Sequence, residues 1–382
     1  MRIAMLSPYA LSRPGGVQGQ VLGLARSLRA RGHAVTVMAP DGGAGRVAGG
    51  ARAAGGAGGA GGAREIFVLG RPTGLRSNGS VAPVTISPWA AVRAERFVRR
   101  GGFDVLHLHE PLAPMASYGL ALRAPVPMVG TYHRAGVSRW VPVFKPLLKL
   151  VGSRLQVRVA VSEAARETGI RSSGGDYEVL FNGVDMERFS QHAPVKDDQG
   201  RPTVLFLGRH EARKGLGVLL NAFASVERPA VLWVVGDGPD REMQRRRHPE
   251  SERVKWLGQL SDEEVAARLS GADVLCAPSL RGESFGMVVL EGMAARCAVV
   301  ASDLEGYRAA AGGHAALVAP GDAAALGRAL RVALADAVEG SGLSSKEALN
   351  AAVAHAQGWS MDALAECYLN AYARAIARYR AG

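Results

Sequence analysis

The sequence predicts an α/β protein built from two doubly wound, Rossmann-like domains. Three observations support this prediction. Short apolar runs alternate with helical segments, this alternation restarts near residue 202, and 382 residues are too many for one hydrophobic core. In open parallel sheets, ligands bind at the carboxyl ends of the strands. We therefore expect two such domains whose strand ends face one another across a cleft.

The first domain is expected to begin with a strand, a glycine-rich turn and a helix, at 2–10, 13–18 and 17–32. Its sheet continues in apolar runs that end in polar residues, at 34–40, 103–111, 126–133 and 157–162. The second domain repeats this order, with apolar runs within 202–215, 230–238, 254–260, 272–279 and 297–302. We place the boundary near residue 192, so that the domains are 1–192 and 193–359 and a helix at 360–382 packs back on the first.

The stretch at 42–64 is almost entirely glycine and alanine, with three arginines. Such a composition cannot bury enough apolar surface to order itself. We expect a mobile loop there that carries no catalytic residue.

Composition limits the classes of protein to consider. No apolar run approaches the ~20 residues that span a bilayer, and the N-terminus lacks the apolar segment of a signal peptide, so a cytoplasmic protein is expected. Cys276, Cys297 and Cys367 are too scattered for a disulfide framework or a metal site and are expected to be buried thiols. The net charge of +12 favours an anionic partner: nucleic acid, nucleotide phosphates or anionic lipid.

Two loops have the composition of phosphate-binding sites. The glycine pair in RPGGVQ at 13–18 opens a helix and either brings backbone amides to an anion or forms a tight turn. It is neither a dinucleotide fingerprint nor a Walker A motif, so neither an NAD enzyme nor an ATPase is supported. In LGRHEARKG, Arg209 ends a strand and Lys214 follows five residues later. The positive charges of this pair are suited to neutralising a diphosphate as it departs. The alternative interpretation is that these residues form a solvated basic loop.

Histidines mark two other strand ends. His107, His109 and Glu110 in FDVLHLHEP suggest a metal site, but residues two apart in a strand share a face and Glu110 points away. No metal is therefore expected. His133 closes the next strand and is better placed to contact a sugar.

A pair of glutamates stands in RGESFGMVVLE at 281–291. Glu283 precedes a predicted helix and Glu291 lies two turns inside it, directly after the apolar run DVLCAPSL. One interpretation is a carboxylate favoured by the helix dipole and an ordinary surface glutamate. The other is a polar ligand held at the end of a strand.

Taken together, these motifs resemble a known enzyme family. PGGVQ, FDVLHLHEP, TYH, AVSE, NGVD, LGRHEARKG, GDGP, LGQL, GESFGMVVLEGMA and AVVASD are similar to those of retaining glycosyltransferases of the GT-B fold that share an E-x7-E motif. Within that group, MRIAMLSPY, NGSVA at 78–82 and GESFG most resemble the actinobacterial phosphatidyl-myo-inositol mannosyltransferases. The resemblance covers nearly the whole chain.

The resemblance implies roles for individual residues. Glu283 would contact hydroxyls of the transferred sugar, Glu291 the ribose hydroxyls, and Arg209 and Lys214 the departing diphosphate. His133 would orient a sugar hydroxyl and support positive charge at the anomeric carbon. Gly16 would give the ligand a side-chain-free approach. The turn before the helix would bind sugar and phosphate through Ser284, Phe285 and Gly286, and the implied acceptor residues are Tyr9, Asn78 and Ser80.

The implied activity is transfer of mannose from GDP-mannose to a phosphatidyl-myo-inositol lipid with retention of configuration. It needs no bound cofactor or essential metal, and a monomer without nucleic acid is expected. The first domain would bind acceptor and membrane and the second the nucleotide sugar. Alternatives are another nucleotide sugar, a soluble sugar, glycoside or small thiol precursor as acceptor, or a non-catalytic carbohydrate- or nucleic-acid-binding protein of this fold. The chain departs from the family member compared near the acceptor, at Ser12, Arg13 and Arg134.

Two basic segments predict peripheral binding to the inner face of the membrane. A helix within 89–102 places Arg93, Arg96 and Arg100 on one face with Arg99 beside them. Its apolar anchors would be Trp89, Val92 and Phe97. The second segment, at 139–150, combines Arg139, Lys145 and Lys149 with Trp140 and Phe144. The alternative is that both helices cover the sheet and their basic side chains form a solvated face.

Overall fold

A computed structural model covers residues 1–382 and divides them into two compact units. It describes 1–11, 15–40, 66–71, 73–77, 80–84, 87–134, 136, 141–227, 229–283 and 285–382, with the backbone alone for 73–77, 80–84 and Pro88. Unit 1 contains Met1–Gly183 and Met361–Gly382, and unit 2 contains Val184–Ser360. The glycine and alanine stretch at 42–64 lies outside the described residues.

Unit 1 is built on a seven-stranded parallel sheet in the order β3-β2-β1-β6-β7-β8-β9. Its strands are β1 (Arg2–Leu6), β2 (Ala34–Ala39), β3 (Ile66–Val68), β6 (Val105–His109), β7 (Met128–Tyr132), β8 (Val157–Ala160) and β9 (Glu178–Val179). A separate antiparallel pair is formed by β4 (Thr73–Ser77) and β5 (Ser80–Val84). The helices are α1 (Gly16–Ala30), α2 (Pro88–Arg100), α3 (Ala116–Arg123), α4 (Val141–Ser153), α5 (Glu163–Ser173) and α14 (Met361–Ala381).

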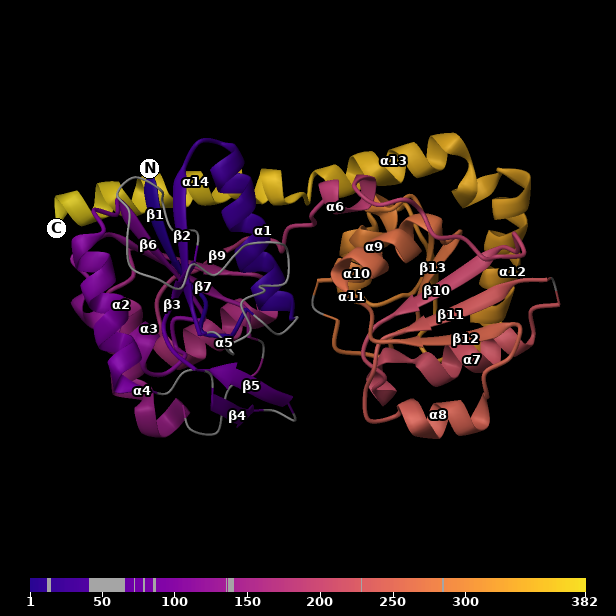
Figure 1. Ribbon diagram of the computed structural model, residues 1–382, viewed down its shortest axis with the longest axis horizontal. Coiled ribbons are helices and arrows are strands. Elements are labelled where there is room, and N and C mark those ends of the chain that lie inside the picture. The colour runs from indigo at the N-terminus through magenta and orange to yellow at the C-terminus, as the bar shows by residue number, and fades with distance from the viewer. Residues whose placement is uncertain are drawn as a thin grey trace. The chain divides into compact units, whose positions relative to one another are not determined.

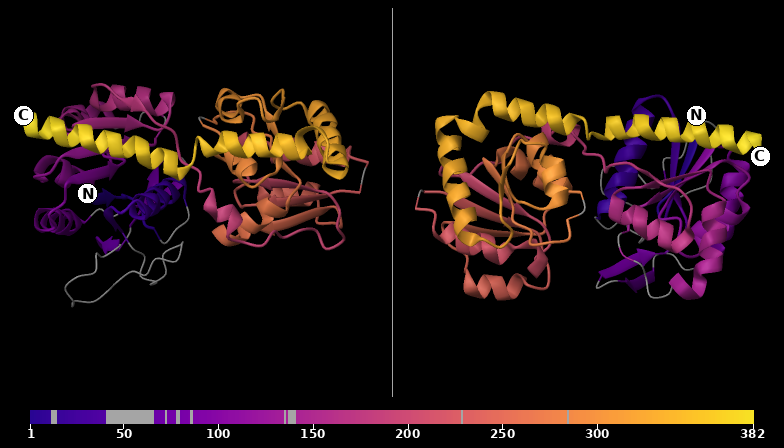
Figure 2. Two further views of the ribbon diagram at one scale, coloured as in Figure 1. Left: turned by 90° about the horizontal axis from the view of Figure 1, so that it is seen from above. Right: turned by 180° about the vertical axis from the view of Figure 1, so that it is seen from behind.

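Both faces of this sheet are buried, which explains why its strands read as continuous apolar runs. In β1, Ile3 and Met5 pack in one core with α1 and α14, whereas Ala4 and Leu6 pack in another with α2 and α3. The C-terminal helix α14, yellow in Figures 1 and 2, lies against β6, β7 and β8. A helix from the end of the chain therefore completes the core of the first unit.

Unit 2 repeats the layered arrangement on a six-stranded parallel sheet in the order β12-β11-β10-β13-β14-β15. Its strands are β10 (Thr203–Leu207), β11 (Val231–Val235), β12 (Val254–Gly258), β13 (Val274–Ala277), β14 (Ala298–Ser302) and β15 (Ala316–Val318). The helices are α6 (Glu187–Ser190), η1 (Ala212–Lys214), α7 (Leu216–Ala224), α8 (Arg241–Arg247), α9 (Asp262–Gly271), α10 (Met287–Ala294), α11 (Glu305–Ala311), α12 (Ala323–Glu339), η2 (Gly342–Ser344) and α13 (Lys346–Gln357).

The two sides of this second sheet also have separate cores. Leu205 of β10 packs with α9, α10, α11 and α13, whereas Phe206 packs with α7 and α12. The predicted fold class, two doubly wound α/β units, is therefore confirmed. Within the described parts of the chain, no helix combines the length and apolar character that a bilayer crossing requires.

The structure places the boundary between the units at Gly183 and Val184, whereas the sequence placed it near residue 192. Val184 forms a β-bridge with Ser360, and Phe189 of α6 lies in the core of unit 2. These contacts attach the segment that follows Gly183 to unit 2.

The cysteines are free thiols in the structure. Cys276 and Cys297 are buried, as expected, while Cys367 on α14 is only half-buried.

Candidate active site

The loop after β10 is fastened to the loop after β13. The backbone N–H of Leu280 donates to the carbonyl of Arg213 over 2.7 Å. Gly215 has a positive φ of 69°, and a Cβ at this position would collide with the carbonyl oxygen of Pro278. A glycine is therefore required where the two loops meet. This contact brings Lys214, which ends η1, to the segment that carries Glu283.

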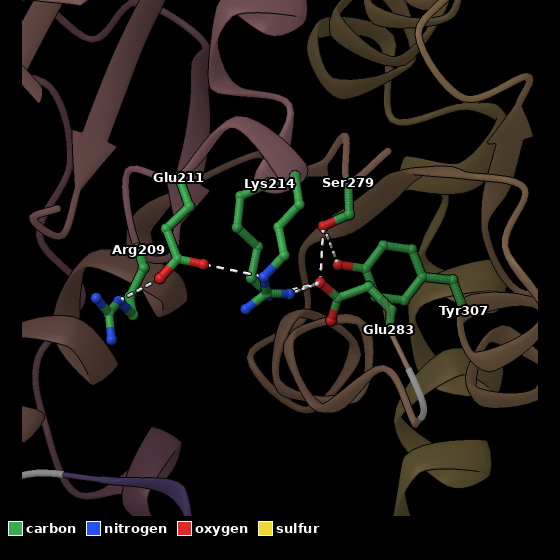
Figure 3. A network of polar contacts seen from close by, with 7 residues as sticks. Arg209, Glu211, Lys214, Ser279, Glu283 and Tyr307 are labelled. Carbon is green, nitrogen blue, oxygen red and sulfur yellow. Dashed lines mark hydrogen bonds and ion pairs between the residues drawn. The ribbon is translucent and has the colours of Figure 1, made fainter. Parts of the chain in front are cut away.

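Glu283 is the centre of a polar cluster in unit 2, shown in Figure 3. Its Oε1 lies 2.7 Å from Nζ of Lys214 and 3.2 Å from Nη1 of Arg213. The same oxygen accepts a hydrogen bond of 3.1 Å from the Ser279 hydroxyl, which lies 2.9 Å from the hydroxyl of Tyr307. Only 12% of the Glu283 side chain is exposed, so this carboxylate is fixed in position by its partners.

Glu211 forms ion pairs with two cations of this loop, Arg209 and Arg213. Its two carboxylate oxygens lie 2.8 Å from Nε of Arg209 and 2.9 Å from Nε of Arg213. Arg209, Glu211, Arg213, Glu283 and Lys214 thus form a row of alternating charges at the carboxyl ends of β10 and β13. The sequence predicted Arg209, Lys214 and Glu283 and missed Glu211 and Arg213. The charged run RHEARK was the available signal, because acidic and basic residues alternate there.

The second glutamate of the pair lies on α10. Glu291 is half-buried, with its Oε1 3.6 Å from Nη1 of Arg188 on α6. Burial raises the pKa of Glu291, and the positive charge of Arg188 opposes that rise. Glu291 is thus paired inside unit 2 and is not an ordinary surface glutamate. Sequence reasoning missed Arg188, which lies about a hundred residues away in the chain.

Gly286 caps the N-terminus of α10 in a left-handed conformation with φ 85°. A Cβ there would lie 2.9 Å from both the carbonyl oxygen of Gly306 and the Cβ of Ala310, so glycine allows this helix to approach α11 closely. The neighbouring Phe285 packs edge-on against Trp359, with ring centroids 5.2 Å apart. Ser284 lies outside the described residues.

His133 follows β7 in unit 1 and is held by two groups. Its backbone N–H donates to Oε1 of Glu110 over 2.6 Å, and its Nε2 lies 3.0 Å from Nδ1 of His109. Glu110 has a φ of 50°, an uncommon backbone conformation for a residue other than glycine. Burial lowers the pKa of His133 to about 4, so its imidazole is neutral at neutral pH. Sequence reasoning considered Glu110 only as a metal ligand and missed this anchoring role.

The two histidines of β6, His107 and His109, pack against each other and have hydrogen-bond partners. His107 and His109 share a face of β6, with ring centroids 4.1 Å apart. His107 contacts Tyr372 and Thr131 through its two ring nitrogens. Among the described residues, no three histidine, cysteine or acidic side chains are arranged to hold a metal ion.

The resemblance assigns Gly16 to the approach of the ligand, and Tyr9, Asn78 and Ser80 to the acceptor. Gly16 is the first residue of α1, and a Cβ there would meet no atom within 4 Å. Packing among the described residues therefore does not require glycine at this position. Tyr9 is half-buried, and burial raises its pKa, with a further contribution from Glu110. Asn78 lies outside the described residues, as do Ser12 and Arg13, where the chain departs from the family member compared, and for Ser80 and its strand only the backbone is described.

The predicted basic helix is α2, and its arginines differ in their contacts. Arg93 donates to the carbonyl of Val68 over 3.0 Å, and Arg99 pairs with Glu95 at 3.0 Å. All four arginines, Arg93, Arg96, Arg99 and Arg100, are exposed.

The expectation that Phe97 is a free apolar anchor is wrong. Its ring stacks on Phe67, with centroids 4.0 Å apart, because this side of α2 covers the sheet. Trp89 is 75% exposed, and Val92 is half-buried.

The second segment corresponds to α4, which exposes a mixed apolar and basic surface. Val143, Phe144 and Leu150 are 66%, 50% and 51% exposed, and the side chains of Lys145 and Lys149 are exposed beside them. Arg139 and Trp140 lie outside the described residues.

Comparison with known proteins gives relatives for both units. Residues 14–188 match Glycosyltransferase Family 4, and residues 201–336 match Glycosyl transferases group 1. A phosphatidyl-myo-inositol mannosyltransferase of Mycobacterium leprae is 39% identical over 341 residues, covering 86% of this chain and 86% of that protein. One of Propionibacterium freudenreichii is 33% identical over 314 residues, covering 80% of this chain and 78% of that protein.

Solved structures extend the likeness of fold. Sucrose-phosphate synthase from Thermosynechococcus elongatus superposes with a TM-score of 0.72 at 20% identity, covering 98% of this chain and 99% of that one. A glycosyltransferase involved in lipopolysaccharide biosynthesis gives a TM-score of 0.61 at 17% identity, covering 96% and 98%. At these identities the structures show the GT-B fold alone, while the closer relatives show the family. The chain therefore belongs to the phosphatidyl-myo-inositol mannosyltransferases, glycosyltransferases of the GT-B fold.

Proposed function

We propose that this protein transfers mannose from GDP-mannose to a phosphatidyl-myo-inositol lipid with retention of configuration. The observation that carries the proposal is the identity of 39% over 86% of both chains with a phosphatidyl-myo-inositol mannosyltransferase. The charged cluster around Glu283 adds physical support, because it gathers groups for a sugar and for a diphosphate at one edge of a parallel sheet.

The donor diphosphate is assigned to Arg209 and Lys214. Both cations already contact carboxylates, Arg209 with Glu211 and Lys214 with Glu283, and Arg213 shares both carboxylates. A diphosphate carries more charge than either carboxylate and gains charge as the bond to the sugar breaks. The two cations would therefore interact more strongly with the diphosphate in the transition state than in the bound donor, which is the differential stabilisation that accelerates a reaction.

The two glutamates are assigned to different parts of the donor. Glu283 would accept hydrogen bonds from hydroxyls of the transferred mannose, and its several partners hold the carboxylate in one orientation for this task. Glu291 would accept from the ribose hydroxyls. The backbone amides of Phe285 and Gly286 would assist at the start of α10, where the helix dipole favours an anion.

His133 is assigned to the transferred sugar. Positive charge develops at the anomeric carbon as the diphosphate leaves, and a cationic imidazole nearby would oppose it. Burial keeps the pKa of His133 at about 4, so the group is a neutral hydrogen-bonding partner at physiological pH. Gly16 is assigned to close approach of the ligand, and Tyr9, Asn78 and Ser80 are assigned to the acceptor.

The enzyme is proposed to act as a monomer, peripheral on the inner face of the cell membrane. Anionic lipid in that leaflet attracts basic protein surfaces. The exposed arginines of α2 and the exposed Phe144, Lys145 and Lys149 of α4 form a surface of the required chemistry.

The test is to incubate the protein with labelled GDP-mannose, GDP-glucose, UDP-glucose or UDP-N-acetylglucosamine and with phosphatidylinositol, free inositol or inositol phosphate. Products are then identified by mass. We expect a mannosylated phosphatidylinositol from GDP-mannose alone. A product that forms only with a soluble acceptor, or only with a UDP sugar, would replace this function by the corresponding glycosyl transfer.

A further inference from the structure

Three histidine rings form a row inside unit 1. The ring centroid of His109 lies 4.1 Å from that of His107 and 5.2 Å from that of His133. His107 and His109 are completely buried, or nearly so, and burial lowers the pKa of all three rings below the usual value. Each ring is therefore neutral at physiological pH and carries one N–H and one bare nitrogen.

The inner end of this row is held by the C-terminal helix. Nδ1 of His107 lies 2.8 Å from the hydroxyl of Tyr372, and its Nε2 lies 2.7 Å from Oγ1 of Thr131. Thr131 in turn lies 2.8 Å from the hydroxyl of Tyr368. Both nitrogens of His107 are therefore satisfied, and its ring presents a fixed surface for the ring of His109.

His109 has a partner at one nitrogen only. Its Nδ1 lies 3.0 Å from Nε2 of His133, while its Nε2 is buried without a hydrogen-bond partner among the described residues. A buried N–H without an acceptor costs more than a bare acceptor nitrogen, and orphaned N–H groups are accordingly the rarer case. The proton of His109 is therefore on Nδ1 and is donated to Nε2 of His133. His133 must then carry its own proton on Nδ1.

We propose that His109 is a positioning residue that sets the tautomer of His133, so that His133 presents an Nδ1–H donor. Tyr372 and Tyr368 of α14 support this arrangement through His107 and Thr131. The proposal deepens the proposed function and rests on it for the role of His133 toward the sugar. It specifies the partner that His133 recognises: an oxygen acceptor, such as a lone pair of a sugar hydroxyl.

The tautomer is measured directly by nitrogen NMR on the full-length protein with ¹⁵N-labelled histidine, because protonated and bare ring nitrogens have well-separated shifts. The variant H133Q identifies the signals of His133. We expect a protonated Nδ1 and a bare Nε2 for His133 in the wild type at pH 7. A protonated Nε2 would overturn the proposal whatever the activity of the enzyme.

Two substitutions of His109 test the cause. In H109N the side-chain amide nitrogen takes the place of Nδ1 and donates to His133, whereas H109F fills the space without a donor. We expect H109N to keep the tautomer of His133, and H109F to give a mixture. If H109F keeps the wild-type tautomer, His109 does not set it. If H109F does not fold, the wild-type spectrum still tests the proposal, because a protonated Nε2 on His133 overturns it.

Activity gives a second readout. H109F should lower kcat roughly 10- to 100-fold, the range seen for partners that orient metal-binding histidines, with little change in the KM for the donor. H109N should recover much of that loss. Y372F should lower kcat less, and Y379F, at an exposed position of the same helix, serves as its control. Equal kcat in H109F and wild type would remove the positioning role.

Failure of the proposed function would look different. If this protein does not mannosylate phosphatidylinositol, the NMR result for His133 is unaffected, and the kinetic comparison is made with whichever donor and acceptor the substrate panel identifies.

Discussion

Arg209 and Lys214, the two cations assigned to the departing diphosphate, are exposed to different degrees. The Arg209 side chain is 56% exposed and contacts Glu211, whereas Lys214 is 20% exposed and contacts Glu283. We expect R209A and K214A each to lower turnover by ~10²-fold or more, because both cations act on charge that grows as the diphosphate leaves. Steady-state kinetics measures this, with R247A on the exposed end of α8 as the matched control. Full activity in both variants would remove the assignment.

Replacement of Glu283 and replacement of Glu291 should have different effects on the binding of GDP and GDP-mannose. If Glu291 binds ribose, E291A weakens binding of GDP and of GDP-mannose alike. If Glu283 binds the sugar, E283A weakens binding of GDP-mannose and leaves GDP binding nearly intact. Calorimetry with the two ligands distinguishes these outcomes, and E347A on the surface of α13 controls for lost charge. Equal losses for both ligands in both variants would contradict the division of roles.

The same cations predict that the chemistry needs no metal. Arg209 and Lys214 can neutralise the diphosphate, which is the task a divalent ion performs in many other transferases. We expect EDTA to leave activity unchanged when the chelator is in excess over all divalent ions in the assay. Loss of activity that Mg²⁺ or Mn²⁺ restores would show that the two side chains are insufficient.

At the scale of elements, α2 and α4 are the helices with surfaces suited to anionic lipid. All four arginines of α2 are exposed, but the guanidinium groups of Arg93 and Arg99 already contact the Val68 carbonyl and Glu95. The double variant R96S/R100S should therefore weaken vesicle binding more than R93S/R99S. At about 1 kcal/mol per basic residue near an anionic surface, the loss is roughly 30-fold.

Cosedimentation with neutral and anionic vesicles at several salt concentrations measures this difference. Binding should weaken as salt rises, because salt screens charges beyond a Debye length. F144S on α4 tests the apolar contribution separately. If the wild type ignores anionic vesicles at low salt, the membrane proposal fails and a soluble acceptor becomes the better hypothesis.

At the scale of the whole molecule, each unit has its own pair of hydrophobic cores. The chain leaves unit 1 after Gly183 and returns to it at Met361. The second passage brings α14 to unit 1, where Tyr368 and Tyr372 are buried beside the histidine row. Unit 1 therefore includes a segment that follows unit 2 in the chain, and its core is complete only when that segment is in place.

The buried histidines should make the stability of the protein depend on pH. Burial lowers the pKa of His107 to about 3 and of His133 to about 4, while an unfolded histidine titrates near 6.5. Between these values the unfolded chain binds protons that the folded chain does not. The free energy of unfolding therefore falls as pH drops from ~6.5 toward 3, by up to ~1.4 kcal/mol per pH unit for each histidine.

Urea unfolding at a series of pH values measures this slope. The variant H107F lacks one of these groups. Its free energy of unfolding should therefore change less steeply with pH than that of the wild type, by the equivalent of about one bound proton. Parallel slopes would mean that His107 does not contribute in this range.

The sequence by itself determined the alternation of strands and helices in both units. Parallel strands covered on both faces must be apolar throughout, so they are visible as continuous runs such as those around β1 and β10. It also predicted which side chains stand at strand ends, among them His133, Arg209 and Glu283. Their roles in binding and catalysis are still predictions.

Only the tertiary structure decided which of these side chains meet. Arg213 and Glu283 are 70 residues apart in the chain, and His107 and Tyr372 are 265 apart, yet each pair is in contact. Such pairs depend on strand order and on the path of α14, which no local pattern encodes. The same reason explains why the prediction for Phe97 was wrong. The amphipathic pattern of α2 does not indicate that Phe67, on another element, covers this ring. Propensity and period act within one element, whereas a site is formed where separate elements converge.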